Sequence, residues 1–298
     1  MYMDANDKRF QRVALIVLGL MAIVCIIPFI LMLSASFTSE NALNVYGYSF
    51  WPQEFSLNSY LYLWQKRSTL LTCYVITIVI AVVGTGLNVF FTSILAYPIS
   101  RPNFRYRQIF SFLIFFTMIF NGGATAWYII WSSVFHIKNT YFALLLPNLL
   151  MSGFNVLLVR NYYASNIPNA IWEAAKIDGA SEPQIFFRII LPLSVPVTAT
   201  VALFSSLAYW NDWINGMYFI SKPELYNINV YLTKLMNNIE MLKNQSSLTQ
   251  GLSMAALELP TVGIRMAIAI IAVLPVLLLY PLLQKYLIRG VVIGAVKG

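Results

Sequence analysis

Long apolar stretches alternate with shorter polar ones along most of the chain. Six of these stretches approach or exceed the roughly 20 helical residues that cross a bilayer. The two longest connections, 34–70 and 210–261, are rich in aromatic and polar residues, and connections of that length usually carry function or bind partners. The pattern predicts a single transmembrane domain over 1–298. Its expected spans are residues 13–33, 71–97, 108–131, 141–160, 190–209 and 262–284.

The first apolar stretch has some features of a cleaved signal peptide. Lys8, Arg9 and Arg12 precede it, and the small residues Ser34-Ala35-Ser36 follow it. The apolar part of a cleaved signal is only about 7–15 residues long, however, whereas this stretch is about 21 residues long. The length favours an uncleaved membrane anchor.

The composition supports the same fold class. Of the 298 residues, 59% are hydrophobic and only 10% are charged, against about 25% charged residues in soluble domains. The two cysteines, Cys25 and Cys73, both lie inside apolar stretches, where they are expected to pack as small hydrophobic side chains. We therefore expect an all-α integral membrane protein that is solvated mainly by lipid.

The net charge of +8 does not indicate nucleic-acid binding, because the basic residues are thinly spread and form no aromatic-interleaved patch. The positive-inside rule explains them better. With the N-terminus in the cytoplasm, 12 of the 19 Lys and Arg residues lie inside, and the short loop 98–107 carries three of them. Both termini are therefore predicted to be cytoplasmic.

Residues 166–184, between the fourth and fifth expected spans, carry clear signals for helix ends. Pro168 fits a first helical turn and Gly179 fits the position just past a helix end. The helix between them is too short and too polar to span a membrane. Asn169, Glu173 and Lys176 are expected on one of its faces and the small or apolar residues on another: Ile171, Ala174 and Ala175.

After Gly179 the chain is expected to start a second helix that leads into the fifth span. Ser181 and Gln184 match the two positions of a capping box. Pro192 and Pro196 are expected to bend the start of that span, because proline inside a helix removes a backbone hydrogen bond. The bend could serve gating or only packing.

These residues resemble the cytoplasmic signature of ABC-importer permeases. That signature is Glu-Ala-Ala, then Gly after three residues, then Ile and Leu-Pro, and this chain has Glu173-Ala174-Ala175, Gly179, Ile189 and Leu191-Pro192 at the required spacings. The C-terminal segment 284–298 is also similar to the tail of carbohydrate-importer permeases related to the smaller permease of the maltose system. With the six spans, the resemblance covers essentially the whole chain.

The resemblance implies a type I ABC importer fold with a coupling helix at about 168–180 that docks on a cytoplasmic ATPase subunit. It implies a heterodimer with a second homologous permease, two ATPase subunits, an extracytoplasmic solute-binding protein and a bacterial plasma membrane. For Glu173 the alternative is a simple pair with Lys176. The residues to which the resemblance gives a coupling role are Glu173, Ala174, Ala175, Asp178, Gly179, Leu191 and Pro192.

The sequence predicts neither an enzyme nor a nucleotide site. It contains no Gly-Lys pair, which the phosphate-binding loop of an ATPase requires, so ATP and magnesium are expected on partner subunits. The only histidine, His136, has no second ligand at metal-binding spacing. Ionisable residues are scarce within the expected spans, which argues against an ion-coupled secondary transporter. A permease for a non-sugar solute is the alternative within the same family.

Aromatic and amide side chains supply candidate solute contacts, since sugar rings stack on aromatic faces and amides bind hydroxyl groups. The alternative is that these residues only mark the membrane interface, where Trp and Tyr are enriched. In the related maltose system the solute contacts come mainly from the other permease. The candidates are Trp127, Tyr128, Tyr209, Trp210 and Asn211.

Overall fold

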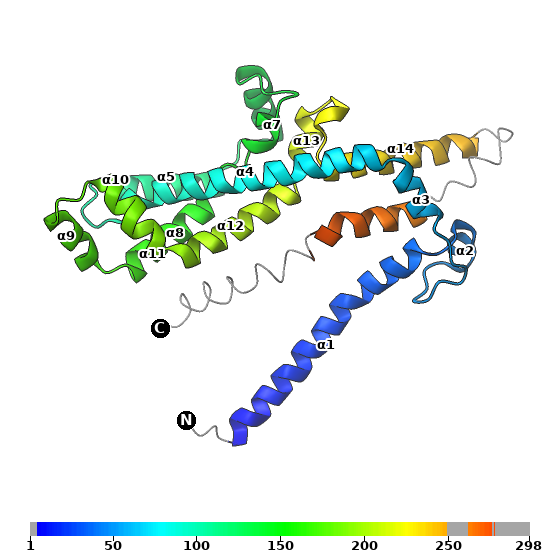
Figure 1. Cartoon of the computed structure of the whole chain (residues 1–298), viewed down its shortest axis with the longest axis horizontal. Coiled ribbons are helices and arrows are strands. Elements are labelled where there is room, and N and C mark those ends of the chain that lie inside the picture. The colour runs from blue at the N-terminus through cyan, green and yellow to red at the C-terminus, as the bar shows by residue number, and fades with distance from the viewer. Residues whose placement is uncertain (1–4, 249–261, 276, 278–298) are drawn as a thin grey trace. The chain divides into compact units, whose positions relative to one another are not determined.

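The computed structural model describes residues 5–248, 262–275 and 277 (Figure 1). All regular elements in this part of the chain are helices, which confirms the all-α fold class. The chain forms two compact units. One contains residues 1–69 and 232–276, and the other contains residues 70–231 and 277–298. A single domain over 1–298 stays a prediction.

In the first unit, α1 (Ala5–Ser36) contains the expected span 13–33. Its segment from Arg9 to Ser36 has a mean hydropathy of 3.1 over its most apolar window, and none of that window is buried. A helix that is apolar on all sides and unburied in protein is suited to a lipid environment. The length and composition therefore support a membrane anchor.

The loop after α1 contains two short helices, α2 (Glu40–Tyr46) and α3 (Asn58–Gln65). The Ser39 hydroxyl caps α2 by accepting a hydrogen bond from the backbone N–H of Ala42 at 3.2 Å. The Glu40 carboxylate accepts backbone N–H groups from Val262 and Gly263 at 3.1 and 3.2 Å. This carboxylate thereby caps the apolar helix Val262–Pro275 and ties it to the 34–70 loop.

The second unit is built around α4 (Arg67–Ser100), a continuous apolar helix that contains the expected span 71–97. Small and polar residues on α4 allow other segments to approach it closely. Gly84 faces the ring of Tyr209, where a Cβ atom would overlap the ring. The Asn88 amide donates to the Leu149 carbonyl at 2.8 Å. Small residues and hydrogen bonds from polar side chains are typical of close packing in membrane proteins.

Two of the expected spans are wrong as continuous helices. Residues 108–131 divide into α5 (Arg107–Ile119) and α6 (Gly123–Ile129), with a bend of 112° between α5 and the segment that α6 begins. Gly123 lies at the break with φ +81°, and its N–H donates to the Asn121 side chain at 2.9 Å. A left-handed glycine next to a local side-chain turn explains why the helix stops here.

The stretch 141–160 is interrupted as well. It contains the single turn α7 (Phe142–Leu145) and then α8 (Gly153–Asn166). Pro147 and the left-handed Asn148, with φ +61°, lie between the two helices. Proline has no backbone N–H with which to continue the helical hydrogen bonds, so the apolar pattern alone overstated the helix.

The expected span 190–209 is present with the bend that its prolines predicted. The axis turns by 80° between the segment Glu182–Leu193 and α12 (Val195–Trp210). In the last expected span, 262–284, the structure describes the helix Val262–Pro275, and residues 278–284 lie outside the described part. The remaining elements are a π-helical turn at Ile130–Val134, α9 (Asn169–Ile177), α10 (Glu182–Ile185), a π-helical turn at Phe186–Ile190, α11 (Leu191–Leu193), α13 (Ile214–Phe219), a 3-10 turn at Pro223–Leu225 and α14 (Ile228–Leu248).

Candidate functional site

The helix α9 (Asn169–Ile177) lies within the expected coupling helix and occupies one end of the second unit, next to α10 (Figure 1). Its C-terminus is closed by its own backbone. The Gly179 N–H donates to the Lys176 carbonyl and the Ala180 N–H donates to the Ala175 carbonyl, both at 3.0 Å. These two bonds form a Schellman motif, with Gly179 at φ +76°. The predicted role of Gly179 as a helix terminator is confirmed.

The next helix begins with the predicted capping box. The Gln184 side chain accepts a hydrogen bond from the Ser181 N–H at 2.9 Å. In return, the Ser181 side chain faces the backbone N–H of Gln184, the third residue of the helix. Only Ala180 separates the Schellman glycine from this cap. Hydrogen bonds therefore fix the backbone on both sides of the short connection between α9 and α10.

The buried face of α9 agrees with the expected one only in part. Trp172 and Ala175 are buried, at 8% and 6% exposure, and join the apolar core of the second unit. Ala174, which was expected on the packed face, is exposed. The large indole of Trp172 occupies the packed face instead of Ala174, because residue 172 lies three positions before Ala175 and on the same side of the helix. Ile177 is left 86% exposed next to Glu173.

A group of five side chains, which we call the Glu182 cluster, joins α9 to the end of α4. Its members are Tyr97, Arg101, Trp172, Lys176 and Glu182. The Glu182 carboxylate accepts hydrogen bonds from Arg101 Nη1 at 2.7 and 3.0 Å and from the Tyr97 hydroxyl at 2.6 Å. Lys176 Nζ lies 3.2 Å from the same carboxylate. One carboxylate thus holds groups from α4, from the loop after it and from α9.

The Arg101 guanidinium also stacks on the aromatic members of the Glu182 cluster. It lies 4.3 Å from the centroid of the Trp172 ring and 5.1 Å from that of Tyr97. The two rings are themselves 5.2 Å apart. Stacking and charge-assisted hydrogen bonds act on the same planar group, which lysine could not reproduce. The sequence predicted a place for Lys176 on the polar face of α9 and for Arg101 only in the basic loop 98–107, and it gave no role to the other members of this cluster.

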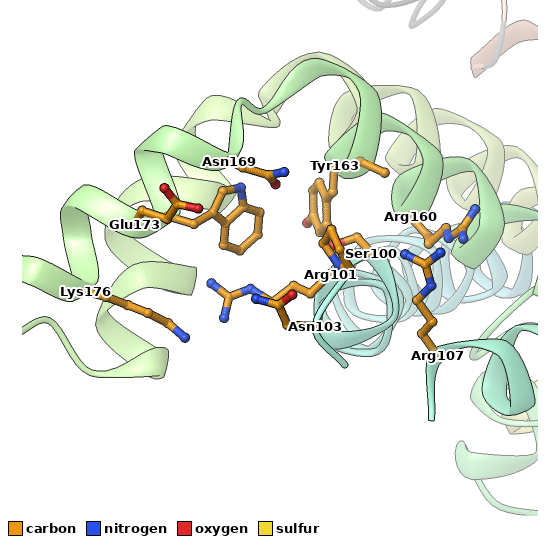
Figure 2. Close-up of a pocket in the computed structure, with 12 residues that line it drawn as sticks. Ser100, Arg101, Asn103, Arg107, Arg160, Tyr163, Asn169, Glu173 and Lys176 are labelled. Atoms are coloured by element: carbon orange, nitrogen blue, oxygen red, sulfur yellow. The ribbon is translucent and has the colours of Figure 1, made fainter. Parts of the chain in front are cut away.

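A pocket of about 400 Å³ opens beside the Glu182 cluster (Figure 2). Side chains from α9, from α8 and from the connection between α4 and α5 line it. Glu173 and Asn169, which were predicted to share a face, both lie on its wall with Lys176. Glu173 makes no ion pair within 4 Å in the described part of the chain, so the structure does not show the alternative pairing with Lys176.

Leu191 and Pro192 lie just before the 80° bend, and Pro196 lies just after it. Ser194, at the bend itself, is fully buried, and its hydroxyl donates to the Leu191 carbonyl at 2.9 Å. The bend is therefore a packed feature with its own hydrogen bond. None of these contacts involves α9 directly, and a role for Leu191 and Pro192 in coupling stays a prediction.

The candidate solute contacts occupy two different environments. Tyr128 stacks on Phe219 at 5.7 Å, and Trp127 meets the same ring edge-on at 4.8 Å. Tyr128 also lines a hollow of about 380 Å³ with Met217 and Tyr218, two residues that sequence reasoning did not single out.

Tyr209 and Trp210, by contrast, are buried, at 1% and 7% exposure. The Tyr209 hydroxyl donates to the Leu145 carbonyl at 2.8 Å, which gives this side chain a packing role. Asn211 is exposed at the end of α12. A solute contact at any of these residues remains a prediction.

Asp212, which directly follows α12 and Asn211, belongs to the same run of candidate solute contacts as Tyr209 and Trp210. One carboxylate oxygen accepts the Asn215 N–H at 3.1 Å, whereas the other, Oδ2, is buried with no hydrogen-bond partner in the structure. Burial raises the pKa of Asp212 to about 6. The folded state therefore binds this proton more tightly than the unfolded state, and stability falls as pH rises from about 4 to about 6.

Replacing Asp212 with Asn should remove this pH dependence. The amide keeps an acceptor for the Asn215 N–H but carries no charge. We expect the melting temperature of the purified protein in detergent to be higher in Asp212→Asn than in the parent at pH 7.5, with the difference shrinking at pH 4.5. An equal shift at both pH values would contradict the assignment.

The fold and the site together define a polytopic membrane protein with an ordered, partly exposed helix between spans. Residues 88–293 match the family described as the binding-protein-dependent transport system inner membrane component. The chain belongs to this family.

The similarity to other proteins extends over nearly the whole chain. Protein LplC of Bacillus subtilis (strain 168) is 34% identical over 100% of this chain and 98% of its own length. The polygalacturonan/rhamnogalacturonan transport system permease protein YtcP of the same organism is 32% identical over 98% of this chain and 100% of its own. A solved bacterial ABC transporter involved in the import of the acidic polysaccharide alginate has a chain that is 28% identical, with a TM-score of 0.78, over 96% of this chain and 99% of its own.

Proposed function

We propose that this protein is a permease subunit of an ABC importer for a carbohydrate, with an oligosaccharide as the transported solute. The family and the full-length similarity to permeases whose names specify polysaccharide transport support this assignment. The chain moves the solute and does not hydrolyse ATP. ATP and magnesium bind to partner ATPase subunits.

The observation that carries the proposal is the outward face of α9. Ile177 is 86% exposed at the end of a helix whose other side is anchored in the core by Trp172 and Ala175. This face presents an apolar strip formed by Ala174 and Ile177, with the Glu173 carboxylate beside it. A rigid helix that presents apolar and acidic groups together is suited to docking in a groove of a partner protein.

The contacts inside this unit indicate how motion would pass from the docked helix into the membrane. A force on Ile177 moves α9 as a rigid body, because the Schellman motif and the capping box fix both sides of the Gly179 bend. Through the Glu182 cluster, α9 is tied to the end of α4. Alternating access then follows from shifts of packed helices between two discrete arrangements.

The proposed assembly contains a second, homologous permease, two ATPase subunits and an extracytoplasmic solute-binding protein. The complex resides in a bacterial plasma membrane with both termini in the cytoplasm. α9 then faces the cytoplasm, where the ATPase subunits are. Accessibility of the single-cysteine variants Ile177→Cys and Lys222→Cys to a membrane-impermeant thiol reagent tests this orientation, since only the variant at position 222 should react in intact cells.

The exposed isoleucine gives a direct test of docking. Ile177→Glu should lower co-purification of the ATPase with the complex in mild detergent by at least tenfold, because a charge replaces the apolar centre of the contact. Ile177→Val is the matched control and should retain co-purification. Normal recovery of the ATPase with the Glu variant would show that α9 is not the docking element. ATPase assays with and without the binding protein then identify the functional complex.

A further inference from the structure

The pocket beside α9 has a strongly basic lining, and the coupling role leaves two of its cations, Arg107 and Arg160, without a function (Figure 2). Four of its lining residues are cationic and one, Glu173, is a carboxylate. Figure 2 shows Arg107 and Arg160 on the same side of the pocket, away from Lys176 and Arg101. Two guanidinium groups on one wall repel each other unless an anion lies between or beside them.

The part of the chain that the structure describes supplies too few acidic partners for these cations. Glu182, next to the pocket, is shared between Arg101 and Lys176, at 2.7 and 3.2 Å. Within the described residues, neither Arg107 nor Arg160 has a carboxylate within 4 Å. The pocket therefore carries an excess of positive charge on the side of Arg107 and Arg160.

Two hydrogen-bond donors at this site are also left without an acceptor. Arg160 Nε and Arg101 Nη2 are both buried and have no partner in the structure. Another N–H group of Arg160, on Nη1, donates a hydrogen bond to the side chain of the neighbouring Asn161 at 2.8 Å. A buried charged donor without an acceptor is costly, and an anion in the pocket would remove that cost.

The position of the pocket limits what that anion can be. Ser100 is the last residue of α4 and Arg107 the first of α5, so the pocket lies where two apolar helices end. Basic pockets at the cytoplasmic ends of membrane helices commonly hold lipid headgroups. Guanidinium groups match phosphate oxygens particularly well, through paired, charge-assisted hydrogen bonds.

We propose that this pocket is a phosphate-binding site in which Arg107 and Arg160 hold the phosphate of an anionic phospholipid headgroup or of a soluble phosphate compound. The proposal rests on the proposed function only for the placement of this end of the unit at the cytoplasmic membrane surface. Binding is measured on the purified chain without transport, so a failure here leaves the proposed function untouched.

The first experiment measures phosphatidylglycerol retention by native mass spectrometry over a range of lipid concentrations, with phosphatidylcholine as the neutral comparison. Arg107→Gln combined with Arg160→Gln should weaken phosphatidylglycerol binding about thirtyfold, since each basic group near an anionic lipid contributes roughly a factor of five. The matched control is Arg105→Gln with Arg188→Gln, which removes two exposed arginines outside the pocket and should retain the parent affinity.

A second pair of variants keeps the test open if the double arginine variant does not fold. Ala164 is exposed on α8 and lines the pocket. Ala164→Glu places a carboxylate among the arginines and should compete with the phosphate, whereas Ala164→Gln has the same size without the charge and should not. The expected result is weaker phosphatidylglycerol retention in the Glu variant alone.

Inorganic phosphate distinguishes the two sources. Stabilisation of the parent by millimolar phosphate but not by chloride at equal ionic strength, lost in the double arginine variant, supports a soluble phosphate compound. Selective phosphatidylglycerol retention without that stabilisation supports the lipid.

Two results would overturn the proposal. One is equal retention of phosphatidylglycerol, and equal response to phosphate, in the parent and in both pocket variants. The other is unchanged lipid and phosphate binding combined with loss of ATPase co-purification in the double arginine variant. That second pattern would assign the pocket to an acidic side chain of the ATPase.

Discussion

Uptake of the solute should fall to background in a Gly179→Pro variant. Gly179 has φ +76°, whereas proline is fixed near −65° and lacks the N–H that Gly179 donates to the Lys176 carbonyl. The Schellman motif would be lost and α9 would leave the chain at a different angle, so it could no longer reach the ATPase and the Glu182 cluster together. Uptake of labelled solute by cells that express the complete transporter measures the effect.

Gly179→Ala is the graded control for that variant. No atom lies within 4 Å of the position that its Cβ would take, so the cost is only the left-handed backbone, about 1–2 kcal/mol. We expect reduced but measurable uptake and normal amounts of protein in the membrane. If the proline variant transports at the parent rate, α9 does not transmit motion through this bend.

Breaking the Glu182 cluster should uncouple ATP hydrolysis from transport. In Arg101→Ala the Glu182 carboxylate loses its closest cation, and the Trp172 ring loses the guanidinium stacked 4.3 Å away. Together these contacts stabilise the attachment of α9 by about 2 kcal/mol, after allowing for the half-exposed carboxylate. A loss of that size lowers the ratio of attached to detached α9 about thirtyfold.

The readout is the ATPase rate of the reconstituted complex, measured with and without the solute-binding protein, together with uptake. We expect basal hydrolysis to continue while stimulation by the binding protein and uptake fall at least tenfold. Arg101→Lys keeps the charge but not the planar stacking, so it should lie between the parent and the alanine variant. Glu182→Gln combined with Arg101→Ala should cost less than the sum of the two single losses, because both changes remove the contact between Arg101 and Glu182. Fully additive losses would show that the two residues act separately.

The local features of the site could be read from the sequence, and its long-range contacts could not. Gly179, Ser181 and Gln184 act on their immediate neighbours in the chain, so fixed spacings were sufficient to predict the helix end and the capping box. The contact between Arg101 and Glu182 joins positions 81 residues apart. No local pattern marks such a pair, because its geometry depends on how α4 and α10 pack.

The errors in the helices have a similar physical origin. Hydrophobic length predicted α1 and α4 well, since each is one uninterrupted apolar helix. It overstated 108–131 and 141–160, where Gly123 and Pro147 interrupt the backbone without changing the apolar character of the stretch. Hydropathy reports the solvent that a segment prefers, whereas glycine and proline decide whether it stays helical.

The unburied apolar window of α1 has a consequence for how the protein is made. Because that window is not buried against any described residue of the chain, α1 can enter the bilayer as soon as it leaves the ribosome, before any later helix exists. The helices of the second unit, which depend on partners such as Tyr209 against Gly84, must wait for distant segments to be synthesised. Insertion and folding are therefore separate events in time, and the N-terminal helix commits the chain to the membrane first.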